Sequence, residues 1–451
     1  MSKAFLNYLK KITMDYVISK KSECLSGTVK IPGDKSISHR ALIIGSMSIG
    51  VSKITGLLES EDVFSTMTAL KKLGVKIENS NDTYIVDGRG IAGFKEPEEY
   101  IDLGNSGTGI RLLLGAIMGS NIMVNFKGDY SLSKRPMERV LDPLKQMGAS
   151  ILASNYGKLP ISIKSPKEAL AIEYKSKISS AQIKSAVLLS GLSASGITKY
   201  IEPIRSRDHT EKILSKFGAN ISSKTSSNGS NIIKLNGRTN LIGNNISVPS
   251  DPSSVAFPLV STIIVPNSKI EIHNVMMNST RDGIFETLQE MGAKIKIFNK
   301  KLVDSENTAS IYAEYSKLQG INVPSERSPR MIDEYPILSI AAACATGNTI
   351  MNGISELRVK ESDRIKIISN GLNKAGIKTI EKNDSLEVLG GDIEGNCSID
   401  SELDHRIAMS FLILGLVANN PIKVLRPSTI NTSFPSFFDI MNNLGAKLVG
   451  P

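Results

Sequence analysis

A cluster of anion-binding side chains stands at residues 31–41, "IPGDKSISHRA", immediately before an apolar run. Lys35, Ser36 and Arg40 fall at the start of the helix that this run predicts. A cation at a helix N-terminus opposes the macrodipole, typically by ~0.3–1 kcal/mol. A bound anion would supply the missing negative charge, so the stretch predicts an anion-binding site. It is not a Walker A loop, because "GDKS" lacks the first glycine at the required spacing.

The same arrangement recurs at other expected helix starts. The further cations are Arg111, Arg135, Arg207, Arg281, Arg358, Lys360, Arg364, His405 and Arg406. Structural salt bridges on surface helices would explain one such cluster. Five clusters in register favour several helix N-termini that bind one polyanionic ligand.

Six internal echoes indicate the architecture. Each echo reads as the last turn of an amphipathic helix, a glycine suited to the left-handed C′ position, and a strand. The segments are "LKKLGVKI", "LKQMGASI", "LSKFGANI", "LQEMGAKI", "LNKAGIKT" and "MNNLGAKL", with glycines at 74, 148, 218, 292, 376 and 445. Their spacing of roughly 70–84 residues predicts a small α/β unit with two helices.

A second helix in each unit is apolar on nearly all sides beyond its first residues, which predicts burial. The six candidates are "SISHRALIIGSM", "NSGTGIRLLLGAIMG", "SSAQIKSAVLLSGL", "DPSSVAFPLVSTIIV", "IDEYPILSIAAACA" and "LDHRIAMSFLILGLVA". Their polar residues stand almost entirely at the N-terminal end, where capping alone explains one Ser, Asp or Asn each.

Length and charge narrow the class of protein. A chain of 451 residues exceeds the usual size of one hydrophobic core, so two or three domains are expected. The formal charge of +10 favours acidic partners. Aromatic residues are few and no long Lys/Arg block occurs, which favours a small anion over nucleic acid.

The cysteines and the apolar segments bear on location. Cys24, Cys344 and Cys397 show neither disulfide nor metal-site spacing, which fits a reducing compartment. Residues 1–14 lack the pattern of a secretory signal, and Met14 is an alternative start that would make residues 1–13 dispensable. No apolar run reaches the length of a membrane helix, so we expect a cytoplasmic protein.

Eight motifs, in order and at matching spacing from about residue 20 onward, resemble 5-enolpyruvylshikimate-3-phosphate synthase, class II in particular. They are "PGDKSISHRA", "LGNSGTGIRL", "GDYSLSKRPMERV", "SAQIKSAVLLSG", "SRDHTEKIL", "MIDEYP", "ELRVKESDRI" and "LDHRIAMSF". The resemblance implies transfer of the enolpyruvyl group of phosphoenolpyruvate to the 5-hydroxyl of shikimate 3-phosphate, with release of phosphate. It implies no cofactor and no metal, and small-molecule substrates rather than nucleic acid or membrane as partners. We expect a monomer.

The resemblance also implies an α/β fold of two domains with three βαβαββ-type repeats each, an inside-out α/β barrel. One domain would span residues 34–249 and the other 1–33 plus 250–451, with crossovers near Gly33 and Ser250. The active site would lie in the cleft between them.

Site residues follow by matching this sequence to the family motifs. The positions for shikimate 3-phosphate are Lys35, Ser36, Arg40, Ser180, Ala181, Gln182, Arg207, Asp333 and Lys360. The positions for phosphoenolpyruvate are Lys35, Gly107, Arg135, Gln182, Arg364 and Arg406. Guanidinium groups suit its carboxylate and phosphate, because they bind such groups bidentately.

Three residues match catalytic positions. Asp333 corresponds to the carboxylate near the target hydroxyl, and Glu361 to the group that protonates the methylene carbon and later reclaims a proton. Lys35 could share either duty. For Glu361 to act as an acid, burial or substrate charge must offset Lys360 and Arg364.

Several positions need separate comment. Gly107 matches the position where an added methyl would crowd glyphosate, the competing inhibitor, and some tolerant class II members carry alanine there. Ala181 and Thr432 depart from class I, where a serine and a catalytic-site lysine stand, and both departures agree with class II. His39, His209 and His405 stand at helix starts, where either phosphate binding or plain capping would explain them.

Two rival functions differ in testable ways. An enolpyruvyltransferase that acts on a UDP-sugar shares the fold but commonly uses a cysteine on a mobile loop, and none of the three cysteines stands in a Gly-rich loop. A non-catalytic anion or nucleic-acid binder would not need Asp333 and Glu361, because carboxylates weaken anion binding.

Overall fold

The computed structural model describes residues 14–450, so the expectation that residues 1–13 are dispensable lies outside the described residues. The chain divides into two compact units. Unit 1 comprises Gly33–Val248 and Val303–Ser305. Among the described residues, unit 2 comprises 14–32, Pro249–Leu302 and 306–450. The chain thus changes unit next to Gly33 and next to Val248.

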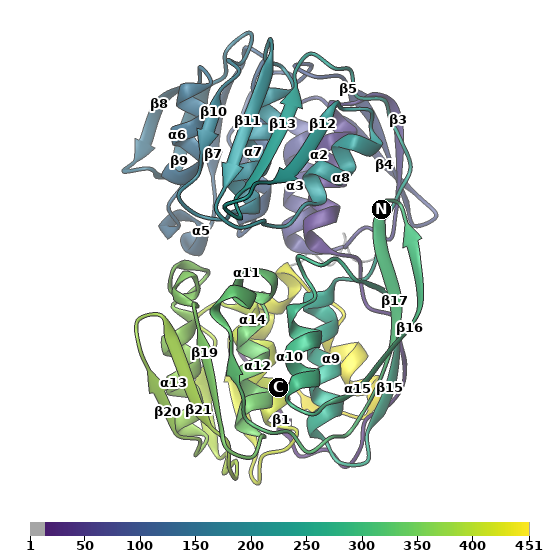
Figure 1. Cartoon of the computed structure of the whole chain (residues 1–451), viewed down its shortest axis with the longest axis vertical. Helices are drawn as coiled ribbons and strands as arrows, with labels where there is room; N and C mark the ends of the chain where they lie inside the picture. The colour runs from purple at the N-terminus through teal and green to yellow at the C-terminus, as the bar shows by residue number, and fades with distance from the viewer. Residues whose placement is uncertain (1–13, 451) are drawn as a thin grey trace. The chain divides into compact units, whose positions relative to one another are not determined.

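Unit 1 contains three four-stranded sheets, each with its own helices (Figure 1). The first repeat has α2 (Lys35–Met47), β3 (Ile49–Thr55), α3 (Glu61–Lys72), β4 (Lys76–Ser80), β5 (Thr83–Arg89) and, from the end of the unit, β14 (Ile246–Ser247). The second has β6 (Ile101–Asp102), α4 (Gly107–Ala116), β7 (Met123–Lys127), α5 (Tyr130–Lys134), α6 (Glu138–Gln146), β8 (Ser150–Asn155) and β9 (Lys158–Lys164). The third has β10 (Glu173–Lys175), α7 (Ala181–Gly191), β11 (Ile197–Glu202), α8 (His209–Lys216), β12 (Ile221–Thr225) and β13 (Asn231–Asn236).

Unit 2 repeats this plan with strands borrowed from the start of the chain. Its first repeat has β2 (Ser26–Val29), α9 (Pro252–Ile264), β15 (Lys269–Met276), α10 (Gly283–Glu290), β16 (Lys294–Val303) and β17 (Glu306–Glu314). The next repeat has β18 (Asn322–Val323), α11 (Ser328–Met331), α12 (Tyr335–Ala343), β19 (Asn348–Asn352), α13 (Arg364–Lys374), β20 (Thr379–Glu381) and β21 (Ser385–Leu389). The last has β22 (Cys397–Asp400), α14 (His405–Leu414), β23 (Ile422–Leu425), α15 (Phe437–Leu444), β24 (Lys447–Val449) and β1 (Tyr16–Lys20).

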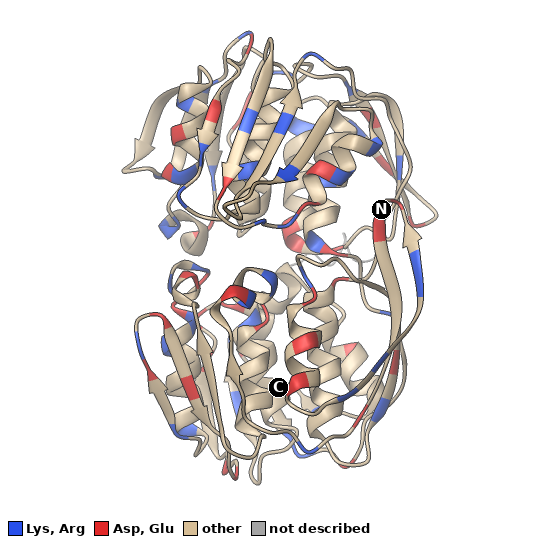
Figure 2. Cartoon of the chain, in the orientation of Figure 1, with Lys and Arg blue, Asp and Glu red and all other residues tan. Residues whose placement is uncertain are grey.

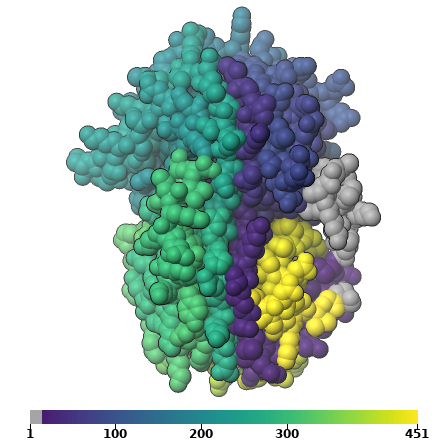
Figure 3. Space-filling view, turned by 90° about the vertical axis from the view of Figure 1, so that its right-hand side faces the viewer, coloured from purple at the N-terminus to yellow at the C-terminus, as the bar shows by residue number. Residues whose placement is uncertain are grey.

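All six sheets share one topology. A short first strand pairs in parallel with the second, and two further antiparallel strands complete the sheet, as in the order β6-β7-β9-β8. These two strands form a hairpin in five sheets, whereas β1 and β24 come from the two ends of the chain. In four sheets a buried helix joins the first strand to the second, which gives the expected βαβαββ repeat. In the other two the first strands are exchanged: β2 precedes α2 but pairs with β15, and β14 precedes α9 but pairs with β3. In Figure 3 a purple N-terminal segment lies beside the yellow C-terminal segment. In the sheet of the last repeat β1 pairs with β23 and β24.

The two sequence signals for these repeats are confirmed. The six glycines that end the amphipathic helices, from Gly74 to Gly445, all have φ between 89° and 111°, a left-handed conformation that disfavours a side chain. The six apolar helices α2, α4, α7, α9, α12 and α14 are buried along almost their whole length. In Figure 2 these interior helices carry charged residues mainly at their ends. None of the helices within residues 14–450 combines the length and apolar character needed to cross a membrane.

One predicted helix start is wrong. The segment that follows Ser355 forms a short 3-10 turn over Ser355–Val359, and α13 begins only at Arg364. The reason is Asp363, whose carboxylate accepts a hydrogen bond from the Lys366 amide at 3.2 Å and so caps the helix there. Arg358 and Lys360 therefore precede the helix.

Close packing of α4 on α7 in unit 1 generates the first prediction. A Cβ added to Gly115 would lie 2.3 Å from the carbonyl oxygen of Ala186, which is backbone and cannot rotate away. Gly115→Ala should therefore destabilise the protein by about 1–3 kcal/mol in chemical denaturation, because the two helices must separate. The control is Gly45→Ala in α2, where the nearest atom is 3.4 Å away. Equal stability of the two variants would contradict this account of the packing.

Candidate active site

The predicted residues form two clusters, one in each unit. In unit 1 the first is built at the start of α2. The Asp34 side chain accepts a hydrogen bond from the Ile37 amide at 2.7 Å, so the helix begins at Lys35. The Lys35 ammonium lies 2.7 Å from the carboxylate of Asp62, which is buried in the first turn of α3. This ion pair fixes the amino group at the N-terminus of α2.

Arg40 is buried one turn further along α2 and joins three helices. Its Nη1 donates to the carbonyl of Ser36 at 2.9 Å, its Nε to Thr210 at 2.7 Å and its Nη2 to Ser185 at 2.8 Å. Ser185 belongs to α7 and Thr210 to α8. These three oxygens fix the direction of the guanidinium.

Arg111, a buried residue of α4, connects the second and third anion-binding motifs. Its Nη1 donates to the Gly107 carbonyl at 3.2 Å and to Gln182 Oε1 at 3.0 Å. The Gln182 amide in turn donates to the Thr108 hydroxyl at 3.0 Å. The first turns of α4 and α7 therefore lie together, as phosphate binding by both would require.

Arg135 lies against the backbone of Gly107. A Cβ built at Gly107 would stand 2.6 Å from Arg135 Nη1 and 3.0 Å from Arg111 Nη1. Glycine at this position thus leaves the space that the two guanidinium groups occupy. Any larger residue requires at least one of them to move.

The remaining predicted residues of unit 1 stand at the start of α7 and before α8. Ser180 caps α7, and Ala181 is its first helical residue. The amide of Ala181 belongs to the first turn, where N–H groups have no intrahelical partner, so its backbone can contribute to anion binding. Arg207 lies in the loop between Glu202 and His209 and is half-buried.

In unit 2 the predicted residues converge on Asp333, which precedes α12. Its carboxylate lies 3.3 Å from the Lys360 ammonium and 3.4 Å from Arg364 Nη1. Its carbonyl accepts a hydrogen bond from Arg406 Nη1 at 3.0 Å. Glu361 completes the cluster through a 2.6 Å ion pair with Arg364 Nη2. All five residues predicted in this unit are therefore brought together.

A residue that the sequence analysis did not single out anchors Arg364. The carboxylate of Asp404 is buried, accepts from Arg364 Nε at 2.7 Å, and caps α14 by accepting from the Arg406 amide at 2.9 Å. Burial alone lowers the pKa of the Arg364 guanidinium, but the charges of Asp404, Glu361 and Asp333 outweigh it, so that pKa is raised. Arg364 therefore stays charged throughout the physiological range.

His39 is buried between the unit 1 residues, and its Nδ1 lies 2.9 Å from the Thr66 hydroxyl. Burial, followed by the charges of Lys35 and Arg40, lowers the pKa of this histidine well below its ordinary value of 6.5. His39 is consequently neutral at pH 7. His209 and His405 are also buried at helix starts.

Three further residues named in the sequence analysis bind other side chains or backbone groups of unit 2. Arg281 is buried and binds Asp251 at 3.0 Å within unit 2. Arg358 binds Asp363 at 2.9 Å and Glu381 at 3.0 Å, beside the capping turn. Thr432 is buried and donates to the Thr429 carbonyl at 2.7 Å. Arg281 and Arg358 therefore form structural salt bridges, which was the alternative to anion binding given in the sequence analysis.

The supporting residues gave weak sequence signals. An acidic residue in the first turn of a helix, such as Asp62, is common on dipole grounds alone. Asp404 reads as an ordinary N-cap, and its contact with Arg364 spans 40 residues of sequence. Arg111 was noticeable as a cation at a helix start, but its contact with Gln182 depends on how α4 and α7 pack.

Comparison with known proteins decides the family. The model of the EPSP synthase (3-phosphoshikimate 1-carboxyvinyltransferase) family matches residues 19–441. The chain belongs to the EPSP synthase family. The 3-phosphoshikimate 1-carboxyvinyltransferase of Pseudomonas sp. (strain PG2982) is 47% identical over 433 residues, covering 95% of this chain and 96% of that protein. That of Chelativorans sp. (strain BNC1) is 48% identical over 434 residues, covering 95% and 97%.

Solved structures confirm the predicted fold. An EPSP synthase from Acinetobacter baumannii, 40% identical, superposes with a TM-score of 0.85 and covers 97% of this chain and 100% of that chain. The enolpyruvyl transferase NikO from Streptomyces tendae is 16% identical and shares the fold, with a TM-score of 0.75 and coverage of 98% and 99%. The expected family, the enolpyruvyltransferase fold and the transferase class are thus confirmed for this EPSP synthase family member.

The neutral state of His39 predicts a pH dependence of stability. The unfolded chain binds a proton at this histidine near pH 6.5, whereas the folded chain does so only at lower pH. Folding stability should therefore fall as the pH drops below about 6.5, by at most about 1.4 kcal/mol per pH unit from this group. Denaturation of His39→Asn between pH 7 and 5 should show a shallower loss than the unsubstituted protein. The half-exposed His273 provides the control, and an equal change in His273→Asn would contradict the assignment.

Proposed function

We propose that this EPSP synthase family member transfers the enolpyruvyl group of phosphoenolpyruvate to the 5-hydroxyl of shikimate 3-phosphate, releasing phosphate in the shikimate pathway. The observation that carries the proposal is the joining of Asp333, Lys360, Glu361, Arg364 and Arg406 into one contact network. Proton-transfer groups in direct contact with guanidinium groups suit a reaction of two anionic substrates. Curated relatives named 3-phosphoshikimate 1-carboxyvinyltransferase are 46–48% identical over 95% of this chain, which supports the proposal.

We propose further that the two clusters bind one substrate pair. Shikimate 3-phosphate would contact Lys35, Ser36, Arg40, the start of α7 and Arg207 of unit 1, and Asp333 and Lys360 of unit 2. Phosphoenolpyruvate would contact Arg135 and the Gly107 backbone of unit 1, and Arg364 and Arg406 of unit 2. The substrates would thereby join the two units, in line with the predicted domains 34–249 and 1–33 plus 250–451.

The chemistry requires two proton movements. Asp333 would accept the proton of the 5-hydroxyl as that oxygen attacks C2 of phosphoenolpyruvate, while C3 gains a proton. In the second half C3 loses a proton and the C2–O bond to phosphate breaks. Glu361 would donate the proton that C3 gains in the first half of the reaction and accept the proton that C3 loses in the second half. Its hydrogen bond with Arg364 must then weaken when substrate anions compete for that guanidinium.

The cysteines favour this activity over the UDP-sugar alternative. Cys344 ends helix α12 and packs against the core, and burial raises the pKa of its thiol to about 12. A thiol with that pKa is a poor acid or nucleophile at neutral pH. Cys24 is exposed, and Cys397 begins strand β22. A cytoplasmic monomer that binds neither nucleic acid nor membrane remains our prediction.

Phosphate release tests the function directly. The purified protein incubated with phosphoenolpyruvate and shikimate 3-phosphate should release inorganic phosphate, and glyphosate should compete with phosphoenolpyruvate. A UDP-sugar acceptor should give no release. Turnover with the UDP-sugar, or none with shikimate 3-phosphate, would refute the proposal.

Glu361→Gln tests the assignment of the proton carrier. The amide keeps the size of the side chain but cannot exchange the proton with C3, so kcat should fall by about 100- to 10,000-fold. Binding of shikimate 3-phosphate by calorimetry should stay within about threefold. Glu387→Gln, on strand β21 of the same repeat, is the matched control and should keep its kcat. Near-normal turnover of Glu361→Gln would remove its assigned role.

A further inference from the structure

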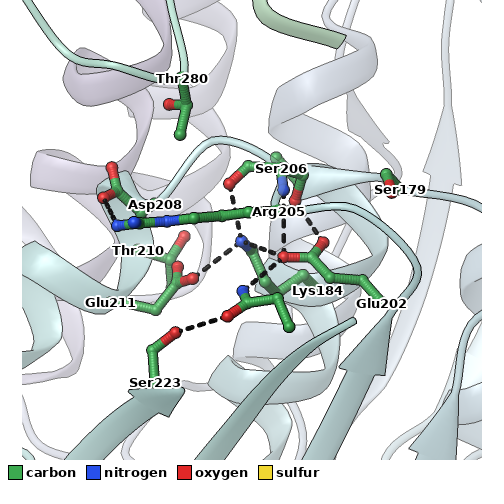
Figure 4. A network of polar contacts seen from close by, with 12 residues as sticks. Ser179, Lys184, Glu202, Arg205, Ser206, Asp208, Thr210, Glu211, Ser223 and Thr280 are labelled. Atoms are coloured by element: carbon green, nitrogen blue, oxygen red, sulfur yellow. Dashed lines mark hydrogen bonds and ion pairs between the residues drawn. The ribbon is translucent and has the colours of Figure 1, made fainter. Parts of the chain in front are cut away.

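A cluster of buried charged side chains, Lys184, Glu202 and Glu211, lies inside unit 1 (Figure 4). The Lys184 side chain, in the first turn of α7, is fully buried. Its ammonium lies 3.1 Å from Glu202 Oε1, 2.8 Å from Glu211 Oε1 and 3.2 Å from the Ser206 carbonyl. Glu202 is fully buried and Glu211 nearly so.

Such a cluster is an unusual way to fill a core. Removing an ammonium and two carboxylates from water is unfavourable, and apolar side chains of similar volume often stabilise a fold as well or better. In some proteins buried ions are retained because they fix a geometry. The contacts around Glu202 are of the kind that would do so.

Glu202 binds the loop that follows it. Its carboxylate accepts from the Ser206 amide at 3.1 Å, from the Ser206 hydroxyl at 2.5 Å and from Asn231 at 2.9 Å. At the other side of the loop, the Ser179 hydroxyl donates to the Ile204 carbonyl at 2.6 Å and accepts from its amide at 3.0 Å. Residues 203–208 are therefore held by the end of β11, by α7 and by the residue preceding the α7 cap.

The neighbouring residues of α7 and α8 hold Arg40, another residue predicted to bind shikimate 3-phosphate. Ser185 of α7 and Thr210 of α8 share a 2.6 Å hydrogen bond, and both accept from Arg40. Lys184 and Glu211, which are adjacent to them in sequence, form the ion pair of the buried cluster. One α7–α8 contact thus supports Arg40 on one side and the 203–208 loop on the other.

We propose that Lys184, with Glu202 and Glu211, is a positioning residue for the phosphorylated acceptor. The cluster fixes the backbone of Arg207 relative to Ser180, Ala181 and Gln182 at the start of α7. It thereby sets the affinity for shikimate 3-phosphate and leaves the proton chemistry of unit 2 unaffected. This inference rests on the proposed function.

Two variants test it, with a packing variant as control. Lys184→Met removes the central charge, and Glu202→Gln keeps the shape of the carboxylate while weakening the hold on Ser206. Leu235→Ala removes buried methyl groups from β13 in the same sheet and changes no polar contact of the loop. Calorimetry with shikimate 3-phosphate, steady-state kinetics and hydrogen exchange at the Ser206 amide are measured for each.

We expect the dissociation constant for shikimate 3-phosphate to rise at least tenfold in Lys184→Met and about fivefold in Glu202→Gln. The Ser206 amide should exchange faster, while kcat at saturating substrates changes less than threefold. Leu235→Ala should lower thermal stability without these effects. If Lys184→Met does not fold, Glu202→Gln decides by the same criteria.

Three outcomes would overturn the inference: unchanged affinity in a folded variant, a loss confined to kcat, or an equal loss of affinity in Leu235→Ala. Binding by the unsubstituted protein separates this inference from the proposed function. If the unsubstituted protein neither binds shikimate 3-phosphate nor releases phosphate, the proposed function fails. If it does both and the variants bind equally well, only the positioning role of Lys184 is refuted.

Discussion

The positive ends of buried helices are the constraint on which the functional clusters depend. In each unit, helices inside the core begin with residues that carry or bind cations, although the macrodipole disfavours positive charge there. The chain relieves part of this conflict with its own acceptors. Amides and cations at the same helix starts would both attract an anion, which is the physical basis of the proposed substrate sites.

The two units stabilise their arginines by different chemistry. In unit 1, Arg40 and Arg111 donate to hydroxyl, amide and carbonyl oxygens, which fix the direction of each guanidinium. In unit 2, Arg364 is surrounded by Asp333, Glu361 and Asp404. The first arrangement suits binding of phosphate groups. The second keeps the carboxylates that we propose to move protons in contact with the cations that we propose to bind phosphoenolpyruvate.

Supporting residues behind these clusters fix the geometry of the predicted binding residues. Asp404 binds both Arg364 and the amide of Arg406 at the start of α14. A single carboxylate thus sets the distance between two arginines predicted to bind phosphoenolpyruvate. Close approach of α4 and α7, permitted by Gly115, brings Gly107 and Gln182 to one bridging arginine. The buried Lys184 extends the same principle to the loop that carries Arg207.

Local signals in the sequence determined the repeats, most of the helix ends and the residues that we propose to bind anions. Left-handed glycines and apolar helices are set by nearest-neighbour sterics and by burial, so a single sequence shows them. The start of α13 was predicted too early, because both Asp363 and the charged run before it could begin a helix within a few residues. Tertiary structure alone decided which cations have structural partners, such as Arg281, and which residues, such as Asp62, Asp404 and Lys184, hold the others. Those contacts join residues that lie 18 to 40 positions apart, and their geometry depends on helix packing that no local pattern encodes.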